Sequence, residues 1–349
     1  MMTPSSASGT HRARWGWGLG AVLAVMVVLV LAMMWWWDTE PSPFAPDQVT
    51  RTTLADMHAH AVPGAETTIT LMHSVDTLLD KRGGYLSNDV LPPGVFMDNV
   101  PHWEYGVLTA SRDLVRAMRN DFSRSQAQST EDADLAKADP LLSSPNNRWL
   151  LPSSESQYGK AVDHLRAYLK RLTDGHDGDA NFYARADNLA DYLQVASSRL
   201  GSLSQRLSAS VGQIRLDESP GNGAPPSAST SAPAMAGADA ADTREQRVKT
   251  PWSQIDDNFY EARGYTWALL VQLKAFRHDF APVLRDKQAR ISLDQVIREL
   301  EEAQHPLGSP VVLNGSPFGL FANHSLVMAN YISRANAALI DLRELLRRG

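Results

Sequence analysis

Asp56, His58 and His60 form an Asp-x-His-x-His pattern, the arrangement in this chain best suited to metal chemistry. In a β-strand, side chains two residues apart point to the same side, so both imidazoles would face one ion. Histidine and carboxylate groups are ligands that zinc accepts, and a catalytic zinc ion activates a water molecule. The pattern therefore makes a metal-dependent hydrolase one hypothesis for this chain.

The sequence around this pattern argues against a metal enzyme. The pattern is similar to the first-strand metal motif of the amidohydrolases, whose barrel needs eight strand and helix pairs with further ligands on later strands. The residues that follow His60 have helical spacing and lack runs rich in valine or isoleucine. A solvated histidine pair, or adventitious affinity for a metal ion, is the alternative, and no cofactor is predicted.

A second group of polar residues lies where a predicted helix gives way to a loop, between Arg119 and Ser129. Guanidinium and amide groups suit carboxylates and hydroxyls, so this segment would bind an anionic or sugar-like ligand. The alternative is structural, because such residues also cap helices and close loops. The same two interpretations apply to the turn at 87–89 and to Trp103, which lies beside prolines. The candidate ligand-binding residues are Ser87, Asn88, Asp89, Trp103, Arg119, Asp121, Arg124, Gln126 and Gln128.

Carboxylates beside a histidine offer a different class of function, a hydrolase that works by acid–base catalysis. His102 with Glu104, Asp113 or Asp121 comes nearest to such a set. The chain contains no Gly-x-Ser-x-Gly turn, phosphate-binding glycine loop or zinc-protease helix motif. It also contains no cysteine, which excludes disulfides, thiolate nucleophiles and thiolate metal sites. The sequence therefore identifies no catalytic residue.

The clearest element of the chain is a membrane-spanning helix at residues 15–37. These 23 residues carry no charge and, at about 1.5 Å each, span roughly 34 Å, enough for a hydrocarbon core of about 30 Å. Five of the nine tryptophans lie at its two ends, as in interfacial belts. Arginines precede the span, within residues 1–14, and Asp38 and Glu40 follow it. The positive-inside rule therefore predicts a cytoplasmic tail at 1–14 and places the rest of the chain outside.

A cleaved signal peptide is the competing interpretation of this segment. Such peptides have an apolar region of about 7–15 residues and small side chains at the cleavage site. This apolar run is longer and ends in Met33, Met34 and three tryptophans. We therefore expect residues Trp15 to Trp37 to remain as an anchor in the lipid bilayer.

Composition divides the exported part of the chain. Residues 38–50 contain three prolines and predict a semi-extended stalk. Residues 216–249 are rich in proline, glycine, alanine and serine and predict a disordered linker. This linker separates a first half, 51–215, from a second half, 250–349. The formal net charge is −6 and the only charges in residues 1–37 are basic, so the exported part is acidic, which excludes a general nucleic-acid binder.

Both halves have helical spacing of apolar residues. A loop rich in proline is expected at 84–104, where Pro101 argues against a helix. A short helix is expected to end before Pro140. A long helix is expected to extend to Ile214, because apolar residues recur at alternating spacings of four and three residues. A helix packed in the core of the chain is favoured over an intermolecular coiled coil. The main expected helices cover residues 68–82, 106–122, 153–172, 189–214 and 264–280.

Two of these helices resemble each other. Six of 17 positions are identical between residues 106–122 and 264–280, including two glycines at the start and Arg-x-Asp-Phe at the end. The alternative is that amphipathic helices share composition alone. The predicted fold is therefore all-α, with one N-terminal transmembrane helix followed by a helical bundle whose repeat indicates two related halves.

Three segments have distinctive amino-acid sequences: GYLSNDVLPPGVFMDN at 84–99, RDLVRAMRNDFSRSQAQSTEDADLAKA at 112–138 and NNRWLLPSSESQY at 146–158. Together they resemble the bacterial family called domain of unknown function 2333, and the similarity extends over most of the chain outside the linker. The resemblance implies an uncharacterised envelope protein with one membrane span, and it supplies no catalytic residues.

These expectations lead to one main functional hypothesis. The chain would be a single-pass protein of the bacterial inner membrane, with its N-terminus in the cytoplasm and its C-terminal domain in the periplasm. It would act by binding, either as a scaffold for envelope proteins or as a receptor for a cell-wall or lipid-derived ligand. The alternative is an envelope hydrolase, and the sequence leaves the partner and the oligomeric state open.

Overall fold

The computed structural model describes residues 9–125, 130–176, 180–217, 244–309, 311–317 and 319–348. This part of the chain is almost entirely helical, as predicted, with one short antiparallel strand pair. The α-helices are α1 (Gly9–Trp37), α2 (Pro46–Asp56), α3 (Ala65–Asp80), α4 (Asn99–Ala117), α5 (Leu135–Leu142), α6 (Ser154–Thr173), α7 (Ala186–Ser208), α8 (Ile255–Asp279), α9 (Ala281–Asp286), α10 (Arg290–Glu302) and α11 (His324–Arg347). The strands are β1 (Gln213–Asp217) and β2 (Arg244–Val248), and short turns lie at η1 (Gly94–Phe96), η3 (Ala209–Val211) and η4 (Trp252–Gln254), with a π-helical turn at η2 (Met118–Phe122).

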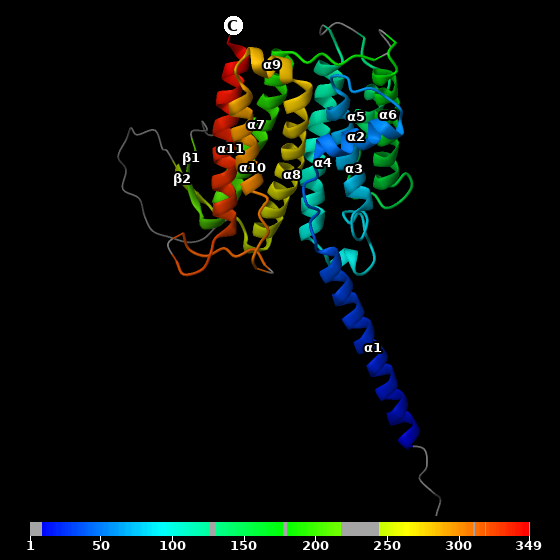
Figure 1. The fold of residues 1–349 in the computed structure, drawn as a ribbon. Coiled ribbons are helices and arrows are strands. Elements are labelled where there is room, and N and C mark those ends of the chain that lie inside the picture. Colours follow the sequence, from blue (N-terminus) through cyan, green and yellow to red (C-terminus); the bar gives the residue numbers. More distant parts are fainter. Residues whose placement is uncertain are drawn as a thin grey trace, which may run out of the picture.

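The long helices lie side by side in a bundle, and α1 projects from one end of it (Figure 1). We call this end the α1 end and the opposite end, where the C-terminus lies, the far end. Successive helices run up and down, so their connections alternate between the two ends. Of the described connecting residues, 81–98, 209–212, 249–254, 303–309, 311–317 and 319–323 lie at the α1 end, whereas 174–176, 180–185 and α9 lie at the far end.

The centre of the bundle is the contact between α4 and α8. Gly106 and Gly264 face each other there, because a methyl group on Gly264 would lie 1.9 Å from the carbonyl oxygen of Trp103. Sixteen residues further along each helix, the rings of Phe122 and Phe280 pack edge to face with centroids 5.4 Å apart. The two helices therefore run parallel, and the matched glycines allow their backbones to touch.

The helices around this pair have the same arrangement on both sides. α3 packs on α6 and also on α8, while α7 packs on α11 and also on α4. This pattern groups α3, α4, α5 and α6 as one set and α7, α8, α10 and α11 as the other. The predicted boundary at 216–249 had placed α7 in the first half, but its packing joins it to the second set. One hydrophobic core runs through both sets.

The expected stalk is packed against the bundle. Arg263, which is 7% exposed, forms a bidentate ion pair with Glu40 at 2.6–3.0 Å. The ring of Phe44 packs edge to face on Trp267 and on His73. α2 then begins at Pro46 in place of extended chain, since proline fits the first turn of a helix. The proline-rich composition predicted an extended backbone for this segment. It could not reveal that Glu40 and Phe44 have partners far away in the sequence.

Three local expectations were wrong. Pro101 lies in the first turn of α4, where its missing N–H has no intrahelical acceptor to lose. α5 continues through Pro140 to Leu142. α7 ends at Ser208, and Ile214 lies instead in β1, paired with Arg247 of β2. The strand pair brackets the predicted linker, whose residues 218–243 are outside the described part of the chain.

The glycine contact predicts the effect of adding one methyl group. We expect Gly264→Ala to lower the free energy of unfolding by about 1–3 kcal/mol, because backbone atoms of α4 block the new side chain. Gly159→Ala is the matched control: it lies within α6 with nothing within 4 Å of the new carbon, so a gain of about 0.5–1 kcal/mol is expected. Denaturant titration followed by circular dichroism measures both, and equal effects would contradict this role for Gly264.

Candidate functional site

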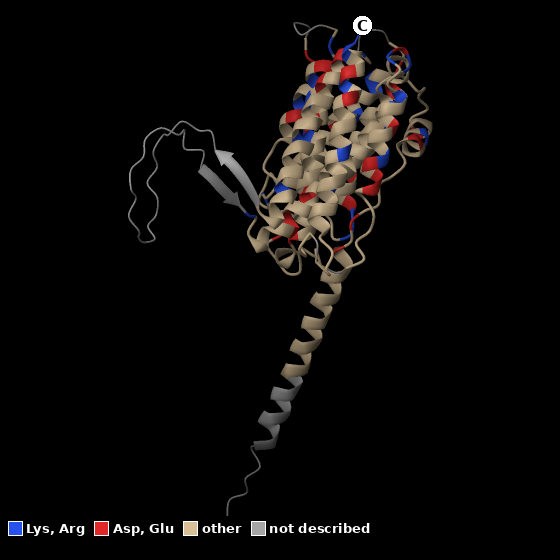
Figure 2. Ribbon diagram, turned by 90° about the vertical axis from the view of Figure 1, so that its left-hand side faces the viewer, with Lys and Arg blue, Asp and Glu red and all other residues tan. Residues whose placement is uncertain are grey.

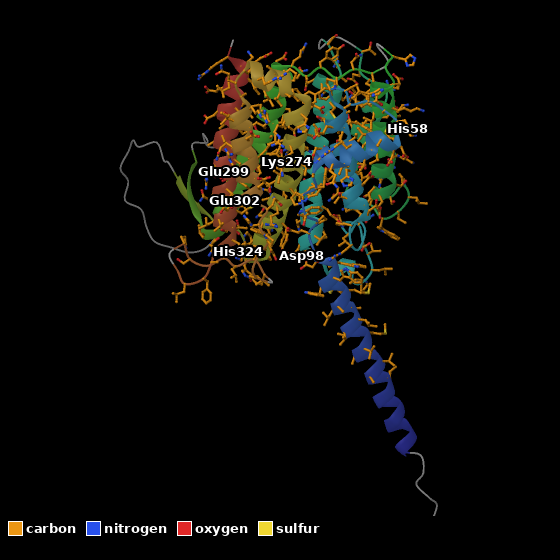
Figure 3. The ribbon with its side chains drawn as sticks, in the orientation of Figure 1. His58, Asp98, Lys274, Glu299, Glu302 and His324 are labelled. Atoms are coloured by element: carbon orange, nitrogen blue, oxygen red, sulfur yellow. The ribbon has the colours of Figure 1, made fainter. Side chains whose placement is uncertain are left out.

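The predicted metal ligands do not lie on a strand. Asp56 is the last residue of helix α2, in which Thr50 and Leu54, four residues apart, are buried. His58 follows the helix and has a left-handed backbone with φ of 52°. Asp56, His58 and His60 are all exposed. Figure 3 shows His58 on the outside of the bundle, apart from the other labelled residues. Within the described residues, no group of three His, Asp or Glu side chains is placed to hold a metal ion.

The predicted ligand residues at 87–89 are used to fold their loop. Glu104 is completely buried and accepts hydrogen bonds from the amides of Leu86 and Ser87, both at 2.8 Å, and from the Ser87 hydroxyl. Burial raises the pKa of Glu104, and its ion pair with Lys81 opposes that shift. Asn88 donates to the carbonyl of Arg148 at 3.0 Å. This hydrogen-bonding pattern makes Glu104 an anchor of the loop.

Other predicted ligand-binding residues are buried, are paired with other side chains or lie far from residues 87–89. Trp103 is completely buried and packs edge to face on Trp267 at 5.4 Å. Arg119 binds Glu131 at 2.8 Å and Asp139 at 3.0 Å. It lies at the far end, whereas Ser87, Asn88 and Asp89 lie at the α1 end, separated by the length of α4, about 28 Å. The two groups therefore form no common site, and Gln126 and Gln128 lie outside the described residues.

The predicted hydrolase set is dispersed as well. Asp113 forms a bidentate pair with Arg199 at 3.0 and 3.1 Å, and His102 faces Asp257 at 3.3 Å. Asp121 lies at the opposite end of α4 from His102, beside Arg124 and the start of α7. No two of these carboxylates converge on the histidine, so this combination cannot carry acid–base catalysis.

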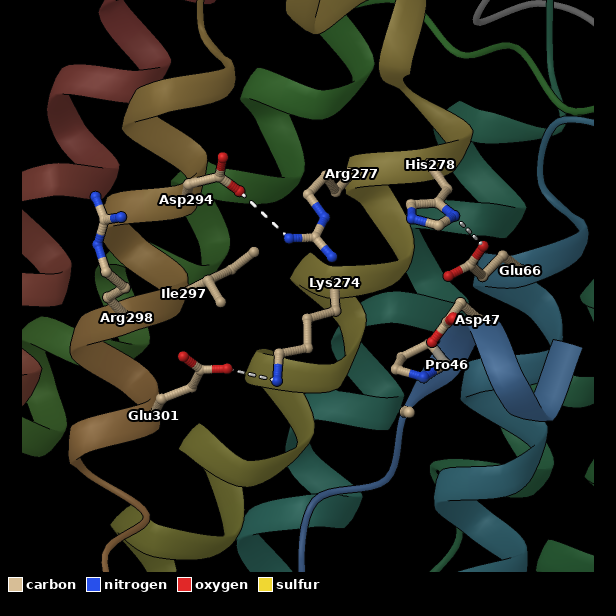
Figure 4. Close-up of a pocket in the computed structure, with 11 residues that line it drawn as sticks. Pro46, Asp47, Glu66, Lys274, Arg277, His278, Asp294, Ile297, Arg298 and Glu301 are labelled. Atoms are coloured by element: carbon tan, nitrogen blue, oxygen red, sulfur yellow. Dashed lines mark ion pairs between the residues drawn. The ribbon is translucent and has the colours of Figure 1, made fainter.

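The structure places a different group of charged residues together. A groove lies between α8, α10 and the first turns of α2 and α3, and it consists of two adjoining cavities of about 450 and 550 Å³. Glu66, Arg277 and His278 line both cavities. Figure 4 shows the first cavity, with α8 supplying Lys274 as well. We call this surface the charged groove.

Ion pairs cross the charged groove. Lys274 contacts Glu301 at 2.6 Å and Arg277 contacts Asp294 at 3.5 Å, so both pairs join α8 to α10 (Figure 4). Each of these pairs is partly exposed, so its partners are available for exchange with a ligand's charges. Arg298 is exposed and donates to Gln295 at 2.9 Å. The groove therefore offers both signs of charge to a polar ligand.

Two carboxyl groups lie at the start of α3, deep in the charged groove. Asp279 accepts hydrogen bonds from the amide and the hydroxyl of Thr67, at 2.7 and 2.6 Å, and so caps α3 from α8. Burial raises the pKa of Asp279. Glu66 faces Nδ1 of His278 at 3.0 Å, and burial together with the charges of Asp279 and Asp47 raises the pKa of Glu66 to about 8. Near neutral pH Glu66 is thus mainly protonated and can donate a hydrogen bond.

Sequence reasoning missed this groove although one signal pointed to it. The repeat matches Arg119 with Arg277 and Asp121 with Asp279. The sequence predicts Arg119 and Asp121 as candidate ligand-binding residues but not their counterparts on the second helix. Asp121 lies in a position equivalent to Asp279, close to the first turn of α7, but its neighbours there include Asp187 and Asp191. Glu66 carries no recognisable motif and lies 213 residues from Asp279 in sequence. Only the folded structure brings Glu66 and Asp279 together.

The raised pKa of Glu66 predicts how stability depends on pH. The unfolded chain releases this proton near pH 4.5 and the folded protein near pH 8, so the free energy of unfolding should fall as pH rises across that window. The slope from one such group is at most about 1.4 kcal/mol per pH unit. Glu66→Gln should reduce this slope, and the remaining slope includes Asp279.

The control for this experiment is Glu301→Gln, which removes a half-exposed carboxylate of the same groove. Denaturant midpoints measured at pH 5, 6, 7 and 8 give the slope for each protein. Wild type and Glu301→Gln should retain the fall with pH. The same slope in Glu66→Gln as in wild type would show that Glu66 is not the group responsible.

Comparison with known proteins identifies a family for the chain. No curated protein and no solved structure matches it. The sequence model of one family, described as uncharacterized protein conserved in bacteria, matches residues 10–349, from the start of α1 to the end of the chain. The match covers nearly the whole sequence, so the chain belongs to this bacterial family, domain of unknown function 2333.

Proposed function

We propose that this protein is a single-span membrane protein whose helical bundle lies outside the cytoplasm and acts by binding. The observation that carries the proposal is α1. Its residues Leu19–Trp37 have a mean hydropathy of 2.5, and none of this apolar stretch is buried inside the bundle. A helix of this length and composition is long enough to cross a bilayer, and it projects away from the protein (Figure 1).

The charges around α1 support one orientation. His11, Arg12 and Arg14 precede the apolar run, while Asp38 and Glu40 follow it. By the positive-inside rule, the N-terminus lies in the cytoplasm and the bundle in the periplasm of the bacterial inner membrane. The far end and the charged groove then face away from the cytoplasm.

The charged groove supports binding as the activity. Its lysine and arginine side chains suit a carboxylate, while protonated Glu66 and the groove's acids suit hydroxyl and amine groups. A cell-wall peptide carries both kinds of group, so we favour this class of ligand over a protein scaffold role. Among the described residues, Asp113 pairs with Arg199 and His102 faces Asp257, so the predicted catalytic carboxylates and histidine do not meet. The hydrolase alternative therefore has less support than binding.

Topology can be tested with single cysteines, because the chain has none of its own. His176→Cys, at a far-end side chain that is 79% exposed, should react with a membrane-impermeant maleimide once the outer membrane is permeabilised. Ser5→Cys, in the tail, should react only after lysis. The reverse labelling pattern, or labelling of both positions before lysis, would contradict the proposed orientation.

Ligand binding can be tested by calorimetry on the full chain in detergent, with a soluble cell-wall peptide as the probe. Arg298→Ala should weaken binding about tenfold or more, since a hydrogen bond to a charged group contributes about 1.5–3 kcal/mol. Arg166→Ala is the control, because Arg166 is an exposed arginine of α6 paired with Asp163 and remote from the groove. No binding by wild type, or equal loss in both variants, would contradict the groove as the site.

A further inference from the structure

Large apolar side chains are exposed together at the α1 end of the bundle. The most prominent are each more than 60% exposed, and we call them the apolar rim: Leu91, Phe96, Leu151, Trp252, Leu320 and Phe321. A patch of this kind on a soluble surface marks an interaction site. Other exposed large apolar side chains of the described bundle lie on its helices, among them Val195 on α7, Ile291 on α10 and Ile340 on α11.

The apolar rim is built by segments far apart in sequence. Leu91 and Phe96 come from the α3–α4 loop, Trp252 from the turn before α8, and the last two from the α10–α11 loop, all at the α1 end (Figure 1). The α5–α6 loop, with Leu151, is held beside them by hydrogen bonds from Tyr85 and Asn88 to the carbonyls of Asn146 and Arg148. One end of the fold thus gathers four separate apolar loops.

Two of these loops contain a long uncharged stretch. Residues 90–97 and 306–323 contain no Lys, Arg, Asp or Glu. Other residues at this end are charged, among them Arg82, Asp89 and Arg148, and Figure 2 shows charged residues along the whole length of the bundle. Exposed apolar side chains gathered at one end of a bundle, with uncharged stretches between them, are typical of an interaction surface.

No free spacer separates the rim from the end of the span. The ring of Trp37, the last residue of α1, lies so close to Gly83 that a methyl group on Gly83 would be 2.8 Å from a ring carbon. Three residues later Glu40 is clamped by Arg263. The α1 end is therefore tied directly to the surface of whatever bilayer α1 enters.

We propose that the apolar rim is immersed in the headgroup interface of the same bilayer that α1 spans. This inference rests on the proposed membrane anchoring. The continuity of the rim with the span favours lipid as its occupant over a second copy or another protein. Trp, Phe and Leu side chains suit the interface, whereas loop backbone is excluded from the hydrocarbon core because its polar groups would lack partners. The rim therefore sits at headgroup depth and orients the charged groove away from the hydrocarbon.

Spin labels on single cysteines test this placement in the full chain, reconstituted into nanodiscs of phosphatidylethanolamine and phosphatidylglycerol. Leu91→Cys, Leu151→Cys and Leu320→Cys report the rim, Leu23→Cys reports the span, and His176→Cys reports the far end. The measurement is the ratio of collision with oxygen, which enters lipid, to collision with a water-soluble nickel chelate. Rim labels should show a higher ratio than His176→Cys and a lower ratio than Leu23→Cys.

The span label separates failure of this inference from failure of the anchoring. A high ratio at Leu23→Cys with rim ratios equal to that of His176→Cys would leave the anchoring standing and overturn the rim proposal. A low ratio at Leu23→Cys would overturn both. Rim labels protected from oxygen and nickel alike would show that a protein covers this end, and would also overturn the proposal. The rim residues are exposed, so their substitution leaves the core intact.

Discussion

The close approach of α4 and α8 is the constraint on which the rest of the bundle depends. Gly106 and Gly264 let two helix backbones meet where any side chain would collide with a carbonyl oxygen. This contact places two sets of helices around a common centre and brings Phe122 against Phe280 at the far end. The registry of α4 against α8 then determines which residues at their ends meet the neighbouring helices.

The charged groove is a consequence of that registry. α8 ends at Asp279, which reaches across to cap α3 through Thr67, and α3 in turn holds Glu66 against His278. The equivalent residue on the other side, Asp121, lies near the acids Asp187 and Asp191 of α7, whereas Asp279 lines a cavity together with Arg277 and His278. Two related sets of helices thus carry different chemistry at equivalent ends.

The two ends of the bundle differ in how the chain is held there. At the far end, the described side chains include exposed ionisable residues such as His176 and Arg348. At the α1 end, the Glu40–Arg263 pair and the packing of Phe44 hold the chain against the bundle directly after α1. A buried, bidentate ion pair restricts geometry more than it adds stability, since desolvation opposes the attraction. Its effect here is to hold the segment that follows α1 in one position against α8.

Sequence patterns alone determined the long apolar N-terminal helix, the all-helical class and the matched helices 106–122 and 264–280, because those properties depend on local charge, apolar spacing and composition. They predicted two boundaries incorrectly. Pro101 lies in the first turn of α4, where a proline is tolerated, and the proline pattern alone did not reveal that the helix begins at Asn99. Ile214 pairs with the distant Arg247, which ends α7 before it. Only the tertiary structure decided the site. The capping of α3 by Asp279, the pKa of Glu66 and the engagement of Glu104 all depend on which side chains folding buries beside one another, and no local pattern records that.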